Sequence, residues 1–136
     1  NESFPVWAFD ASSSEKLDLH GAMTPRYVGA NLKVRVPVIA ASATTGNVGL
    51  AAAFRRIDTA EDVDASHSYS EQAATIAVSG TNGCPTYAEI AFTAAQIDGI
   101  VAGESFVLRL RRDVTVGSNA AGDAQVLVFG IQIIET

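Results

Sequence analysis

The sequence predicts an all-β protein, namely an antiparallel β-sandwich, jelly-roll-like, with about eight strands. Several runs alternate apolar and polar residues, which is the pattern of half-buried strands. Turn sequences rich in glycine and asparagine separate these runs, and no long amphipathic helix lies between them. The 136 residues are 48% hydrophobic, which suits one domain with one core. We predict a single domain over residues 1–136, with residues 1–9 as a possible extended arm.

Eight segments fit strands, and two of them alternate almost strictly. In residues 32–41 the even-numbered apolar residues share one face. Pro37 lies on the other face, and because it has no amide hydrogen it indicates an edge or a bulge. In residues 105–112, Arg109 and Arg111 lie opposite an apolar face. The expected strands are Val6–Phe9, Glu15–His20, Leu32–Ala41, Val48–Ile57, Ala74–Ser79, Tyr87–Ala95, Ser105–Arg112 and Ala124–Ile134.

Two of these segments also fit a helix. Residues 49–65 are rich in alanine, and Thr86 and Glu89 have the spacing of a capping box. We predict strands for both, because neither segment has the charged face of a surface helix. The expected core is Leu32, Val34, Val36, Phe54, Ile76, Ile90, Phe92, Phe106, Leu108, Leu110, Val126 and Val128.

The connections are predicted from their turn residues. "SATTGNVG" at 42–49 indicates a hairpin around Gly46, and Asp58–Gln72 indicates an exposed loop. The last strand is apolar on both faces, which predicts that both are covered, and Gly130 indicates a bulge or a close backbone approach. The 113–123 connection reads as structural, with Arg112 and Asp113 as a surface ion pair.

Composition excludes several classes of function. The net charge of −6 and pI near 4.7 disfavour nucleic-acid binding, which needs clustered cations. No apolar run approaches the roughly 20 residues of a membrane helix, so we expect no membrane partner. The single cysteine, Cys84, can form neither an internal disulfide nor a thiolate zinc site.

No catalytic or metal-binding motif stands out. His20 and His67 are expected to be solvated or hydrogen-bonded, and no G-x-S-x-G sequence accompanies them. Ca²⁺ binding is an open alternative at two acidic segments, although neither has EF-hand spacing. We therefore predict no enzyme activity, no metal and no cofactor. The acidic segments are Asp58, Glu61, Asp62 and Asp64, and the loop with Asp113, Asn119 and Asp123.

The N-terminal segment is unusually apolar for a chain end. Phe4, Pro5, Val6, Trp7 and Phe9 fall within six residues. Such side chains either close a strand onto their own sandwich or reach a neighbouring subunit. We predict an intersubunit contact through Phe4, Pro5, Val6 and Trp7.

Short motifs in a fixed order resemble small β-sandwich structural proteins of tailed bacteriophages. The resemblance implies a virion component, such as a capsid decoration, head-fibre or tail protein, and it implies no catalytic residues. Leu50 departs from the pattern, where an aromatic residue is expected. The matching positions are Phe9-Asp10-Ala11 with Glu15, then Pro25, Tyr27 and Gly29, then Thr45-Gly46, Gly103-Glu104, Arg112-Asp113 and Gly122-Asp123-Ala124.

Three functions follow as expectations. The first is a non-enzymatic virion protein, located in the virion, that associates with other virion proteins and with itself as a homo-oligomer such as a trimer. The second is a carbohydrate- or receptor-binding module, for which exposed aromatic rings would serve as platforms. The third is a surface fibre subunit that is not viral.

Overall fold

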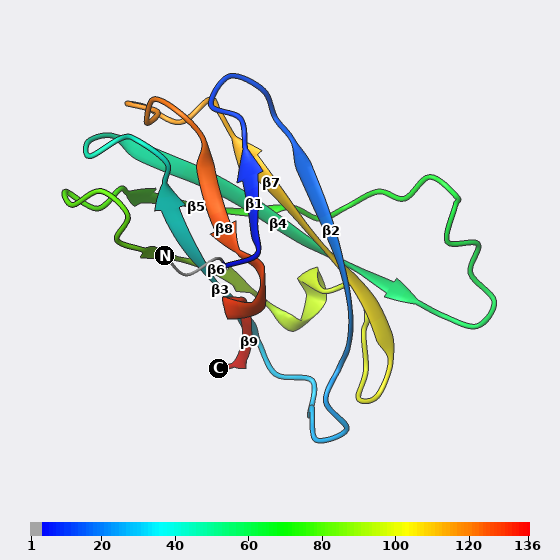
Figure 1. The fold of residues 1–136 in the computed structure, drawn as a ribbon. Coiled ribbons are helices and arrows are strands. Elements are labelled where there is room, and N and C mark those ends of the chain that lie inside the picture. Colours follow the sequence, from blue (N-terminus) through cyan, green and yellow to red (C-terminus); the bar gives the residue numbers. More distant parts are fainter. Residues whose placement is uncertain (1–3) are drawn as a thin grey trace.

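The computed structural model describes residues 4–136 and confirms the predicted fold class (Figure 1). Two antiparallel sheets form a sandwich; one has the order β1-β8-β3-β6, with β9 also paired to β3, and the other has the order β2-β7-β4-β5. This is the arrangement of a jelly roll, in which one sheet holds strands 1, 8, 3 and 6 and the facing sheet holds strands 2, 7, 4 and 5. The strands are β1 Val6–Phe9, β2 Lys16–Ala22, β3 Leu32–Ala40, β4 Asn47–Ile57, β5 Gln72–Ala77, β6 Thr86–Phe92, β7 Ser105–Asp113, β8 Ala124–Leu127 and β9 Gln132–Glu135.

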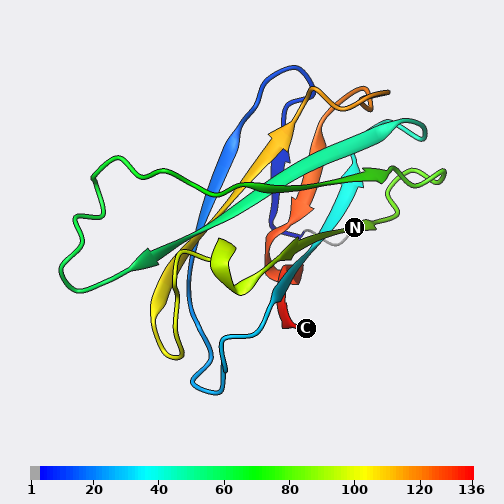
Figure 2. The same cartoon turned by 180° about the vertical axis from the view of Figure 1, so that it is seen from behind.

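The core lies between the two sheets, which Figure 2 shows from behind with β4 and β5 crossing in front of β3 and β8. The ring of Phe54 packs edge-on against Phe92 and Phe106, with centroids 5.0 and 5.4 Å apart. Such edge-to-face pairs stabilise a core beyond the area they bury. The predicted core residues are buried except Ile76, on the edge strand β5, and Val128, which are half-buried.

The segment expected as one final strand is two strands. A short 3₁₀ turn, η2 (Val128–Gly130), separates β8 from β9, and both strands pair with the same edge of β3. The ladder is interrupted at Val36 and Pro37, between the two paired stretches. A Cβ on Gly130 would lie 2.8 Å from Pro37 Cγ, so the predicted close backbone approach is confirmed. The prediction that both faces are covered is wrong, because Phe129 is 88% exposed.

Two connections differ from the prediction. The 42–49 segment is not a hairpin, because β3 and β4 belong to different sheets and the chain crosses between them. Gly46 has a φ of 96° and packs against the 118–120 backbone, where a Cβ would lie 2.8 Å from Ser118 O. The strand expected to reach Ala95 ends at Phe92 and is followed by the 3₁₀ turn η1 (Ala94–Gln96).

The expected surface ion pair at Arg112 is wrong, because this side chain is completely buried. Its guanidinium lies in the 113–123 connection and donates to four oxygens, with no carboxylate among them. Burial lowers the pKa of Arg112 from its ordinary value, although Asp123 and Asp10 oppose that effect from a distance. The connection is therefore organised around an internal cation. The acceptors are Phe9 O and Gly122 O at 3.0 Å, and Asn119 Oδ1 and Ala120 O at 3.1 Å.

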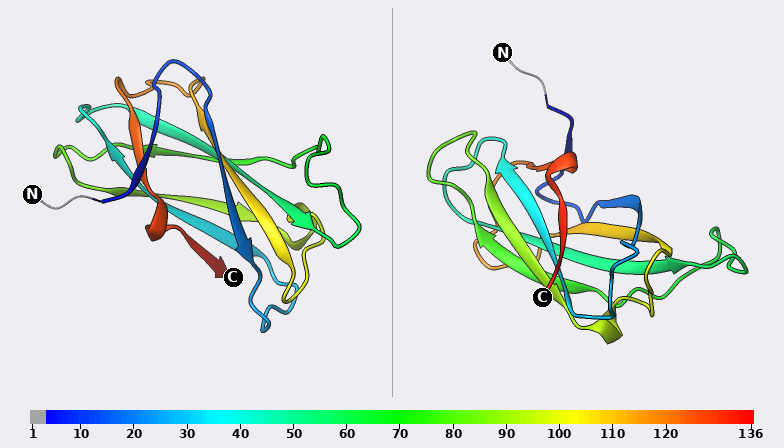
Figure 3. Two further views of the ribbon diagram at one scale, coloured as in Figure 1. Left: turned by 45° about the vertical axis from the view of Figure 1, so that its right-hand side comes forward. Right: turned by 90° about the horizontal axis from the view of Figure 1, so that it is seen from below.

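The N-terminal segment is an internal strand over part of its length. Val6–Phe9 pairs with β8, and Phe9 is fully buried, so the expected arm over residues 1–9 is not free of the sandwich. Residues 1–3 of that arm lie outside the described residues. Phe4 and Trp7 are 65% and 43% exposed. The intersubunit role of Phe4, Pro5, Val6 and Trp7 stays a prediction. Figure 3 shows β1, η2 and β9 together at one edge of the sandwich.

Candidate functional site: a polar groove on the four-stranded sheet

The floor of the candidate site is the outer face of the sheet β2-β7-β4-β5. Leu17 and Leu19 of β2 turn toward the core, so Lys16, Asp18 and His20 lie on the outer face. Register places Asp18 opposite Arg109 of β7. The period-two pattern therefore gathers polar side chains on one side of this sheet.

One wall of the site is the connection from β4 to β5, residues 58–71. Arg55 at the end of β4 is 7% exposed and holds this wall from beneath. Its Nη1 donates to Val63 O at 3.1 Å, and its Nη2 donates to Asp62 O at 2.9 Å. The segment predicted as a plain exposed loop is thus fixed to the sheet by a buried cation.

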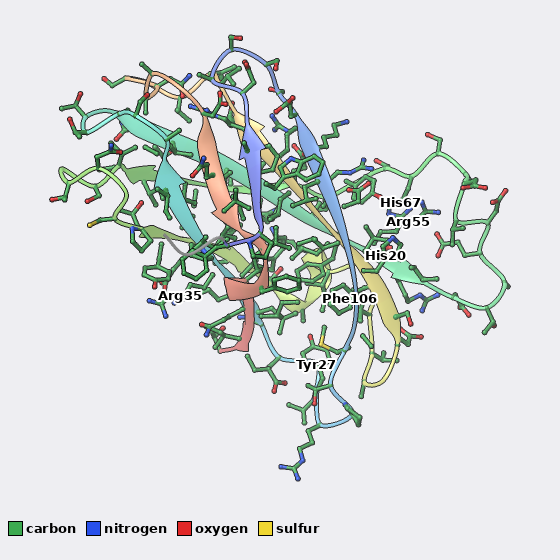
Figure 4. All side chains as sticks on the ribbon, viewed as in Figure 1. His20, Tyr27, Arg35, Arg55, His67 and Phe106 are labelled. Atoms are coloured by element: carbon green, nitrogen blue, oxygen red, sulfur yellow. The ribbon has the colours of Figure 1, made fainter. Side chains whose placement is uncertain are left out.

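Between the floor and the wall lies a groove with a volume of about 630 Å³, within the roughly 300–1,000 Å³ typical of ligand sites. Figure 4 shows His20, Arg55 and His67 on this side of the molecule, beside the 58–71 wall. Most of the lining side chains can donate or accept hydrogen bonds. The lining residues are Lys16, Asp18, His20, Arg55, Ile57, Val63, Asp64, Ala65, Ser66, His67, Tyr69, Val107 and Arg109.

A charged pair and an aromatic ring form the centre of the groove. Arg109 donates from Nε and Nη2 to the two carboxylate oxygens of Asp18, both at 2.7 Å. These bonds hold the pKa of Asp18 below its ordinary value, so this carboxylate is ionised at neutral pH and is an acceptor only. The same guanidinium lies 4.1 Å from the ring centroid of Tyr69. One face of Tyr69 is therefore covered by Arg109.

The two histidines have different surroundings. His67 Nε2 lies 3.4 Å from Asp98 Oδ2, its Nδ1 lies 3.9 Å from Glu61 Oε1, and its ring packs edge-on against Tyr69 at 4.9 Å. The backbone of His20 pairs with β7, but its side chain makes neither a hydrogen bond nor an ion pair with the described residues 4–136. The sequence predicted that His20 and His67 are each solvated or hydrogen-bonded, and it gave no indication that they lie in the same site. The structure brings them into one groove, which sequence reasoning missed.

The two acidic segments considered for Ca²⁺ do not converge. Asp58 pairs with Arg56 at 3.1 Å and Glu61 with Arg55 at 3.5 Å, while Asp62 accepts the amide of Asp64 at 3.0 Å. Asp113 accepts the amide and hydroxyl of Thr115, which is the turn role expected of it. Within the described chain, 4–136, no group of three or more metal-ligating side chains is suited to a metal ion. Over the same range, no helix is long and apolar enough to cross a membrane.

Comparison with known proteins finds little similarity in sequence. No family model matches the chain, and no curated protein matches it. Among solved structures, a similar one is the crystal structure of a family 28 carbohydrate-binding module, described as specific for non-crystalline cellulose. It shares 13% sequence identity, with a TM-score of 0.47, over 94% of this chain and 72% of that one. This likeness concerns the β-sandwich fold alone.

These comparisons correct the resemblance to tailed-phage virion proteins and the function taken from it. The solved structure named above is a carbohydrate-binding module, and neither a family model nor a curated protein supports the virion interpretation. Several of the motifs behind that interpretation lie at turns. Gly46, Gly103 and Gly122 have φ values of 96°, 80° and 80°, so glycine there follows from turn geometry and not from origin. The virion localisation rested on the same resemblance and remains untested.

Proposed function

We propose that this domain is a non-enzymatic carbohydrate-binding module and that a glycan lies in the groove on the four-stranded sheet. The observation that carries the proposal is the composition of the groove. Hydroxyl-rich ligands need donors and acceptors side by side, together with planar groups over which a sugar ring can lie. The groove combines such groups from β2, from β7 and from the 58–71 wall.

The paired geometry of Asp18 and Arg109 supports binding over catalysis. Asp18 is ionised at neutral pH and cannot act as a general acid there, and the hydrogen bonds from Arg109 lower its pKa further. Arg109 uses Nε and Nη2 for Asp18, so its Nη1 is available to a ligand. A fixed guanidinium and carboxylate pair offers a donor and an acceptor in one plane, which matches neighbouring sugar hydroxyls.

The experiment is a glycan array followed by titration calorimetry with the best-binding oligosaccharide. The array includes soluble β-glucans and non-crystalline cellulose. The groove variants are Lys16→Ala and His20→Ala, whose side chains lie on the outer face of the edge strand β2. The control is Lys33→Ala, since Lys33 lies on the other sheet and pairs with Glu89 at 2.9 Å on the surface.

We expect the groove variants to weaken binding roughly tenfold, the worth of about one charge-assisted hydrogen bond, and the control to bind as the unmodified protein does. Two results would reject the proposal. One is the absence of binding to any glycan by the folded protein. The other is binding that Lys33→Ala weakens as much as the groove variants do.

A further inference from the structure

A cluster of charged side chains lies at one end of the groove, on the outer face of β2 and β7. Register places Lys16 of β2 opposite Arg111 of β7. Two residues further along β2, Asp18 lies opposite Arg109. Glu71, the last residue of the wall, pairs with Arg111 at 2.8 Å. The cluster thus holds three cations and two carboxylates and has a net charge of +1, on a chain whose net charge is −6.

Each carboxylate of this cluster is already paired with an arginine. Asp18 accepts from Nε and Nη2 of Arg109, both at 2.7 Å. Glu71 accepts from Nη2 of Arg111 at 2.8 Å and from its Nε at 3.1 Å. These hydrogen bonds hold the pKa of Asp18 and the pKa of Glu71 below their ordinary values. The positive charge in excess is therefore that of Lys16.

The ammonium of Lys16 lines the groove without a partner of its own. Within residues 4–136 its Nζ makes neither a hydrogen bond nor an ion pair, although its charge adds to the effect of the arginines on the pKa of both carboxylates. Arg109 keeps Nη1 for a ligand, since its other two donors go to Asp18. Lys16 and Arg109 are diagonal neighbours across β2 and β7, about 7–8 Å apart, so two such long side chains can reach one ligand group.

The other end of the groove has the opposite charge. Arg55 holds the backbone on both sides of Asp64, so the exposed Asp64 lies at the Arg55 end of the groove. Register places Lys16 in line with Ala51 of β4, which is four residues from Arg55, or about 13 Å along the strand. An anionic ligand group is therefore attracted to the Lys16 end and repelled from the Asp64 end.

We propose that the groove binds an acidic saccharide, whose carboxylate or sulfate group is held by Nζ of Lys16 and Nη1 of Arg109. This inference rests on the proposed function, because it takes a glycan to lie in the groove. A ligand that lies over Lys16 removes water from its ammonium, and a charge that loses water needs a partner. An anionic oxygen supplies one through a charge-assisted hydrogen bond, which is about twice as strong as the bond to a neutral hydroxyl.

The test is titration calorimetry with matched pairs of ligands. Oligosaccharides of galacturonate, of mannuronate and of glucuronate are each compared with their carboxyl-reduced forms, which have the same backbone but no charge. A sulfated oligosaccharide and its desulfated form make a further pair, which distinguishes sulfate from carboxylate. At least one acidic form should bind roughly tenfold more tightly than its neutral partner, the difference expected from one charge-assisted hydrogen bond.

Lys16→Met keeps much of the length of the side chain but removes the ammonium, so this variant should bind both members of that pair alike. Lys33→Met is the matched control and should keep the preference, since Lys33 lies on the other sheet and pairs with Glu89. If neutral forms bind as tightly as acidic ones, or if Lys16→Met keeps the preference, the inference is wrong while glycan binding stands. If no saccharide binds, acidic or neutral, the proposed function fails as well.

Discussion

Replacing Arg112 by methionine tests what holds the β7–β8 connection to the rest of the sandwich. Methionine keeps much of the length and apolar volume of the side chain but cannot donate to the oxygens of Phe9, Asn119, Ala120 and Gly122. Phe9 belongs to β1, whereas the other three oxygens belong to the connection. The single guanidinium therefore joins the first strand to the connection between β7 and β8.

The expected loss follows from these four bonds. Each buried acceptor left without a donor costs about 1 kcal/mol, so the four together cost about 4 kcal/mol. Part of this is offset, because the burial that lowers the pKa of Arg112 also makes the cation costly to hold. We expect Arg112→Met to lower the free energy of unfolding by about 3 kcal/mol, which corresponds to a fall in Tm on the order of 10 °C.

The assay is urea unfolding followed by the fluorescence of Trp7, the only tryptophan, which lies in β1 two residues before Phe9. Arg111→Met is the control on the neighbouring position. Arg111 makes a surface pair with Glu71 at 2.8 Å, and losing it should cost less than about 1 kcal/mol. If both variants lose the same small amount, the four buried bonds do not stabilise the fold and the reasoning is refuted.

Two further changes have defined outcomes. Gly21→Ala should lower the free energy of unfolding by about 1–3 kcal/mol through overpacking, because the added Cβ would meet Phe106 Cζ at 2.7 Å. Gly80→Ala, where nothing lies within 4 Å, should cost little, and equal losses would contradict the crowding argument. Arg109 lowers the folded pKa of Asp18, so this pair stabilises the fold above the ordinary value of 3.8 and stops doing so as pH falls through the lowered pKa. The Tm difference between the unmodified protein and Asp18→Asn should therefore shrink in that acidic range, and a pH-independent difference would exclude the linkage.

The strands could be predicted because their signal is local. Alternating burial along β3 and β7 can be predicted from the period-two pattern alone. For β4 and β6 the alanine content and the capping-box spacing also fitted a helix, but the aromatic residues favoured a strand, and both segments are strands. The same pattern already placed Arg112 on the inward face with Leu108 and Leu110. Because Arg112 is charged, we nevertheless predicted that it lies on the surface. Only the structure reveals the carbonyl oxygens of Phe9 and Ala120 that accept its hydrogen bonds and allow its burial.

The connections between sheets could not be predicted, because a turn sequence does not state which sheet the next strand joins. The glycine at position 46 allows a hairpin and a crossover equally well. Packing against the 118–120 backbone decides between them, and those residues are more than 70 positions away in the chain. The groove was hidden for the same reason. Asp18 lies opposite Arg109 because of the register between β2 and β7, which the sequence does not specify. His67 belongs to a loop segment without a strand pattern, so its position beside the sheet could not be predicted.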